Sequence, residues 1–120
     1  MANDMQTKAN PHFDLDEALS IVDGDRDLFQ ELVDVFRQTY QDELCSIQEA
    51  IRRRDSEALR TASHQFKGTL SALAAGPARE AALRLENMGR NADLGQAETL
   101  YADMEQQVRA LDAALNGWSR

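Results

Sequence analysis

Apolar residues recur along the chain at the three- and four-residue spacings of amphipathic α-helices, and no segment shows the alternation of a strand. The longest helix is expected to begin after a cap at Asp25 and to run to about Arg54. Further helices are expected over about Ser56–Leu73, Pro77–Met88 and residues 93–115. The apolar stripe of the longest helix consists of Leu28, Phe29, Leu32, Val33, Phe36, Tyr40, Leu44, Ile47 and Ile51.

Cap and turn residues separate these helices. Asp14 followed by Glu17 predicts a capping box at the start of a short first helix, and the Asp23-Gly24 pair predicts a turn after it. Asp93 followed by Gln96 predicts a second capping box, before the last helix. Three glycines are expected to end helices: Gly76 as a left-handed C-cap, Gly89 as a stop, and Gly117 together with Asn116.

Short connections between long amphipathic helices make sequence neighbours antiparallel. The sequence therefore predicts an all-α fold, an antiparallel up-down four-helix bundle with the short N-terminal helix covering one end. Residues 1–12 are expected to form a flexible tail, and residues 13–120 a single bundle domain. A hydrophobic content of 42% is enough for a core of modest size.

Composition narrows the classes of function. The net charge of −8 argues against a general nucleic-acid binder, which needs a basic face, and Arg52-Arg53-Arg54 is better explained as the positively charged end of a helix. The single Cys45 cannot form an internal disulfide, which suits a reducing cytoplasm. The polar N-terminus lacks the apolar core of a signal peptide, and no segment approaches the ~20 apolar residues that span a bilayer. We therefore expect a cytoplasmic protein that binds neither nucleic acid nor membrane.

The candidate chemistry lies in the stretch Ser63–Leu70. Helical spacing buries Phe66 and places His64 on the outer face, with Lys67 and Gly68 three and four residues later on that same face. Arg60 and Ser71 extend this face in the two directions. A glycine inside a helix costs about 1 kcal/mol relative to alanine, so Gly68 calls for a compensating role.

The segment His64-Gln65-Phe66-Lys67-Gly68-Thr69 resembles the signature of histidine-containing phosphotransfer (HPt) domains, which is His-x-Leu-Lys-Gly followed by Ser or Thr. Phe66 replaces the usual leucine on the buried side of the helix. Leu15-Asp16-Glu17-Ala18-Leu19, Asp23-Gly24-Asp25 and Leu85-Glu86 are also similar to the family. The resemblance covers roughly residues 13 to 115 and implies the helical bundle that the periodicity also predicts.

The resemblance implies a phosphocarrier of a two-component phosphorelay. His64 would accept a phosphoryl group from a receiver-domain aspartate and pass it to another receiver aspartate, while Gly68 leaves room and Lys67 supports the phosphoryl oxygens. The implied partners are response-regulator receiver domains and a hybrid sensor kinase. The receiver supplies the metal ion, so no metal or cofactor is expected in this chain, which is taken as a monomer.

The supporting residues are less fixed by the sequence. Glu86 matches the position of a family glutamine that orients the imidazole, so it is either such an orienting group or an ordinary solvated glutamate. Gln65, Arg60 and Ser71 flank the histidine and could touch a partner or be plain surface residues.

Other classes of function fit less well. A kinase needs a glycine loop that cradles phosphate, and the six glycines are scattered singly, so autokinase activity is not expected. A metal enzyme in a helical bundle needs Glu-x-x-His pairs, but Thr61 stands three residues before His64. The alternative that remains open is a non-catalytic helical adaptor that binds receiver or kinase domains without phosphotransfer.

Overall fold

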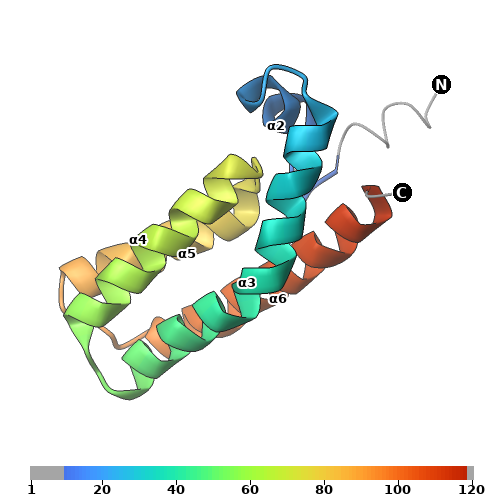
Figure 1. The fold of residues 1–120 in the computed structure, drawn as a ribbon. Coiled ribbons are helices and arrows are strands. Elements are labelled where there is room, and N and C mark those ends of the chain that lie inside the picture. Colours follow the sequence, from blue (N-terminus) through green and yellow to red (C-terminus); the bar gives the residue numbers. More distant parts are fainter. Residues whose placement is uncertain (1–9, 119–120) are drawn as a thin grey trace.

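The computed structural model describes residues 10–118, and every regular element in that range is helical (Figure 1). The ring of four long helices is closed by contacts of α3 with α4, α4 with α5, α5 with α6, and α6 with α3. Successive helices run in alternating directions, which confirms the predicted up-down four-helix bundle. The helices are α2 (Leu15–Ile21), α3 (Arg26–Arg52), α4 (Ser56–Ala72), α5 (Gly76–Arg90) and α6 (Ala97–Trp118).

The short helix α2 lies at the end of the bundle where α4 turns into α5 (Figure 1). The Asp14 side chain caps it by accepting a hydrogen bond from the Glu17 amide, which is the N-cap half of the predicted capping box. The Asp14 amide in turn donates to the Ala74 carbonyl at 3.0 Å, which ties this end of α2 to the α4–α5 turn. Most of the predicted tail, residues 1–12, lies outside the described residues, but Phe13 is already buried.

The core is a continuous apolar cluster drawn from all five helices, and α3 and α6 together supply half of its buried residues. One residue of the α3 stripe was assigned to the wrong side: Leu28 is 41% exposed, because the contact face of α3 centres on Phe29 and Val33. Every long helix keeps a polar outer face. Within residues 10–118, accordingly, none has the apolar length that a bilayer crossing requires.

The helix ends predicted at Gly76 and Gly89 were wrong. Ala74, with φ 54°, takes the left-handed position that was expected at Gly76, and Gly76 instead begins α5. Gly89 lies inside α5 and is buried. A Cβ atom at Gly89 would lie 2.6 Å from the Arg60 backbone nitrogen, so this glycine lets α5 approach the backbone of α4.

Helix α6 also departs from its predicted bounds. It begins at Ala97, and the Asp93 side chain accepts a hydrogen bond from the Gly95 amide in the preceding turn rather than capping the helix. The predicted end at Asn116-Gly117 was wrong, since the helix continues to Trp118. The indole of Trp118 packs edge-on against Phe29, with ring centroids 4.9 Å apart.

Candidate functional site

The site is built on α4, whose orientation is set by its core face. Asp55 caps the helix by accepting a hydrogen bond from the Ala58 amide at 3.0 Å. The buried residues Leu59, Ser63, Phe66 and Leu70 form the face that packs into the bundle. His64 therefore points outward, and its side chain is 63% exposed, as the helical spacing predicts.

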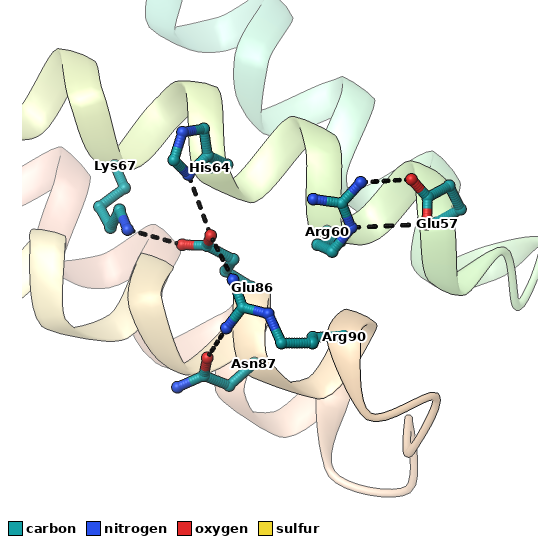
Figure 2. A network of polar contacts seen from close by, with 7 residues as sticks. All are labelled: Glu57, Arg60, His64, Lys67, Glu86, Asn87 and Arg90. Carbon is teal, nitrogen blue, oxygen red and sulfur yellow. Dashed lines mark hydrogen bonds and ion pairs between the residues drawn. The ribbon is translucent and has the colours of Figure 1, made fainter.

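The imidazole of His64 is anchored through one of its two nitrogens. Its Nδ1 lies 2.9 Å from Oε2 of Glu86, a residue of α5 that is only 2% exposed. Because a carboxylate can only accept a hydrogen bond, Nδ1 carries the proton in this pair. Figure 2 shows the other ring nitrogen pointing away from Glu86. Nε2 is thus presented on the outer face of α4, and in the neutral form of the ring it is the nitrogen without a proton.

Glu86 also holds two cations. Its Oε1 forms an ion pair with Nζ of Lys67 at 2.8 Å, and its Oε2 lies 3.1 Å from Nη2 of Arg90 (Figure 2). Arg90 also donates to the side-chain oxygen of Asn87 at 2.7 Å. Sequence reasoning missed Arg90, although its position four residues after Glu86 on one helix is a spacing at which opposite charges meet.

These contacts keep Glu86 charged despite its burial. Burial, the largest influence, raises the pKa of Glu86, but the contacts with Lys67 and His64 outweigh it, and the pKa lies below its ordinary value. The structure thus excludes a solvated glutamate and has the contact expected of an orienting group. Lys67 therefore already has an anionic partner before the ring is phosphorylated.

Gly68 leaves the surface beside His64 open. It is exposed, and a Cβ atom built at Gly68 would meet no neighbouring atom within 4 Å. Nothing within the described chain therefore requires a glycine here, in contrast to Gly89. Any steric reason for Gly68 must come from a molecule that approaches this face.

The three flanking candidates do not join the cluster around Glu86. Arg60 forms an ion pair with Glu57, one turn away on α4, and this contact raises the pKa of Arg60 (Figure 2). Gln65 is exposed, and Ser71 is half-buried near the α2 end of the bundle. These residues border the outer face of α4 without supporting the imidazole.

An exposed histidine on the outer face of a four-helix bundle, with a side chain of the neighbouring helix bonded to its ring, is the arrangement that the resemblance to histidine phosphotransfer domains implies, although here an acid replaces the usual glutamine. The model of the Hpt domain family matches residues 31–115, and the chain therefore belongs to this family. Proteins of this family act as phosphocarriers in phosphorelays, where they interact with receiver domains and kinases, and they are not enzymes in the strict sense.

A solved relative has the same fold. The crystal structure of histidine-containing phosphotransfer protein B (HptB) from Pseudomonas aeruginosa PAO1 superposes with a TM-score of 0.85 at 26% sequence identity. The match covers 92% of this chain and 96% of HptB. A comparison with curated proteins gave no match. The family and the fold thus rest on the domain match and on this structural likeness together.

Proposed function

We propose that Nε2 of His64 accepts a phosphoryl group from the aspartate of one receiver domain and passes it to the aspartate of another. The observation that carries this proposal is the anchored imidazole, in which Glu86 holds the proton on Nδ1 while Nε2 faces outward. A neutral imidazole nitrogen with a free lone pair is a good nucleophile near neutral pH. The exposure of the ring gives a receiver direct access to it.

The neighbouring residues have separate roles in this transfer. Glu86 is a positioning residue that fixes the tautomer and the orientation of the ring. Gly68 provides clearance for the phosphoryl group and for the approaching receiver. Lys67, whose side chain is 24% exposed, can turn its ammonium partly from Glu86 toward the phosphoryl oxygens. Arg60, Gln65 and Ser71 border the surface that a receiver would cover.

In this proposal the protein is a relay component without autokinase activity. Its phosphoryl group comes from a phosphorylated receiver, alone or within a hybrid sensor kinase, and the chain acts as a monomer in the cytoplasm. The exposed thiol of Cys45 fits a reducing compartment.

The proposal is tested by incubating the chain with a phosphorylated receiver domain and looking for acid-labile, base-stable label. Wild type is expected to be labelled, and His64→Gln to be unlabelled with unchanged helicity and melting temperature. His12→Gln is the matched control and is expected to keep full labelling. Label retained in His64→Gln would overturn the assignment. Binding of the receiver by wild type without any label would favour the adaptor function instead.

A further inference from the structure

The acid that anchors His64 differs from an amide in one respect that matters after phosphorylation. An amide can accept through its oxygen or donate through its nitrogen, so it can bond Nδ1 whether or not that atom carries a proton. The carboxylate of Glu86 can only accept. Its Oε2 lies 2.9 Å from Nδ1, and Lys67 at 2.8 Å from Oε1 helps to keep it ionised. A bare Nδ1 lone pair would face a buried negative charge at this distance.

We propose that Glu86 retains the proton on Nδ1 of His64 after Nε2 is phosphorylated, so that the phosphorylated ring is a cation paired with a buried carboxylate. This inference rests on the proposed phosphorylation of His64. It adds that the charge state of the phosphorylated ring, and therefore its reactivity, is set by an acid at position 86.

The transfer balances without release of a proton. The Nε2 lone pair forms the N–P bond while the P–O bond to the receiver's aspartate breaks, and that electron pair leaves with the aspartate carboxylate. The ring gains one positive charge and keeps its Nδ1 hydrogen. In the onward step the N–P electron pair returns to Nε2, and the neutral ring is restored with the same proton still on Nδ1 and hydrogen-bonded to Glu86.

The charges around the ring come from two helices. From α4, Lys67 and Arg60 are positive, and Arg60 is paired with Glu57. From α5, Glu86 is negative and Arg90 is positive, with Nη2 at 3.1 Å from Oε2 of Glu86. The Lys67 and Arg90 cations oppose a third positive charge on the ring, but the phosphoryl group brings negative charge that offsets them. On the opposite flank of α4, Glu43 of α3 contacts Thr69 instead of the ring.

A retained proton makes phospho-His64 a more reactive donor. Cleavage of the N–P bond from a protonated ring expels a neutral imidazole, a better leaving group than the anion that a neutral ring would release. We therefore expect wild-type phospho-His64 to transfer and to hydrolyse faster than a variant with an amide at position 86. A carboxylate within ~4–6 Å of the ring raises the pH at which Nδ1 loses its proton by about 1–3 units. At a pH above the deprotonation midpoints of both wild type and the amide variant, hydrolysis is therefore expected to be about tenfold or more faster in wild type.

The test uses the full chain labelled with ¹⁵N-histidine and phosphorylated chemically with phosphoramidate, so that no receiver is needed. Nitrogen shifts of the ring report directly whether Nδ1 carries a proton. In wild type the Nδ1 proton is expected to remain at about pH 8, where an ordinary imidazole, with a pKa of ~6.5, is neutral. Glu86→Gln is expected to lower the midpoint of Nδ1 deprotonation by at least about 1 pH unit and to slow hydrolysis. Glu80→Gln, the same change at an exposed position of α5, should do neither.

The outcomes separate this inference from the proposed function. The inference alone would be overturned if wild type is phosphorylated at Nε2 but its Nδ1 carries no proton at about pH 8, where an ordinary imidazole is neutral. The wild-type spectrum decides this even if Glu86→Gln folds poorly. Phosphorylation with a retained proton but no exchange with any receiver would overturn the proposed relay and leave the inference standing. Failure of phosphoramidate to modify His64 would overturn both.

Discussion

At the scale of single residues, the site depends on one buried carboxylate that serves three partners. Glu86 bonds the ring of His64 and forms ion pairs with Lys67 and Arg90. Removing any one partner leaves the acid less well compensated, because a buried charge retains its desolvation penalty when a contact is lost. Lys67 is therefore expected to affect both folding and phosphorylation.

Lys67→Ala is expected to lower the free energy of unfolding by about 1–2 kcal/mol, the range for a buried group that loses one partner while others remain. It is also expected to slow His64 labelling several-fold, because the ammonium no longer meets the phosphoryl oxygens. Urea unfolding and single-turnover transfer measure the two effects. Lys67→Arg should restore part of the stability and part of the labelling rate, since the charge survives.

Arg84→Ala, at an exposed position of α5, is the control and should change the unfolding free energy by under about 0.5 kcal/mol. Equal values for all variants would show that the ion pair with Glu86 is inconsequential.

At the scale of elements, the distance between α4 and α5 decides whether Glu86 reaches His64. Gly89 allows the close approach, since a Cβ there would lie 2.6 Å from the Arg60 nitrogen and 2.7 Å from the Ser56 carbonyl oxygen. Backbone atoms cannot move aside as the end of a flexible side chain can. The two helical glycines near the site therefore have opposite reasons to be small: Gly89 for its own fold, Gly68 for a partner.

The same substitution at these two glycines is expected to have opposite effects on stability. Gly68→Ala should raise the free energy of unfolding by about 1 kcal/mol, because helix propensity improves and the added methyl group meets nothing. Gly89→Ala should lower it by about 1–3 kcal/mol through overpacking against α4. Thermal and urea unfolding of both variants test the pair.

Functional measurements complete the comparison of the glycines. Gly68→Gln should remain folded but transfer phosphoryl groups far more slowly, because its side chain occupies the space proposed for the receiver. Unimpaired transfer in Gly68→Gln would contradict the clearance role. A stable Gly89→Ala variant with normal transfer would contradict the close approach of the two helices.

The helix ends offer an independent prediction. Ala92 follows α5 with φ 53°, a left-handed conformation that costs a residue with a Cβ about 1–2 kcal/mol. Ala92→Gly should relieve most of this strain and raise the free energy of unfolding by up to about 1 kcal/mol after the extra chain entropy of glycine. Ala113→Gly, in the exposed interior of α6, is the matched control and should lower it by about 0.5–1 kcal/mol. A decrease in both variants would show that the turn after α5 is not strained.

At the scale of the whole molecule, two partly or fully buried acids make stability depend on pH in opposite senses. The pKa of Glu86 is lowered, since Lys67 and His64 outweigh its burial. Its stabilisation is present above the unfolded-state pKa of ~4.3 and is lost as the pH falls through the lower folded-state pKa. Burial raises the pKa of Glu43 on α3 more than hydrogen bonds from Thr69 and Thr39 lower it. Ionised Glu43 therefore destabilises the fold above its folded-state pKa, and this penalty disappears in acid.

Replacing each acid with its amide should show that ionised Glu86 stabilises the fold and ionised Glu43 destabilises it. Near pH ~7, Glu86→Gln should lower the free energy of unfolding and Glu43→Gln should raise it. Both differences from wild type should shrink in urea titrations as the pH falls below about 4.3, because Glu43 is then protonated and the stabilisation from Glu86 is lost as the pH approaches its lowered folded-state pKa. Changes of the same sign for both variants, or differences that do not depend on pH, would contradict the assigned charge states.

Local signals in the sequence were sufficient for the class of fold and the position of the histidine. Helical periodicity predicted the all-α bundle, because burying an apolar stripe is the main gain available to each helix. The same periodicity placed Phe66 inward and His64 outward. Capping at Asp14 and Asp25 was also predicted correctly, since an N-cap depends on residues within one turn.

Features that depend on contacts between helices could not be predicted from local sequence signals. The burial of Glu86 and its bond to His64 join residues that lie on different helices, so the sequence left this residue open between two interpretations. The buried position of Gly89 and the left-handed Ala74 were likewise missed, because glycine is only the preferred residue at a helix end and tertiary packing can override that preference. The sequence by itself determined that His64 faces outward, as the proposed phosphoryl transfer requires. Only the tertiary structure decided what anchors that residue, because the acid is brought to the imidazole by the packing of α5 against α4.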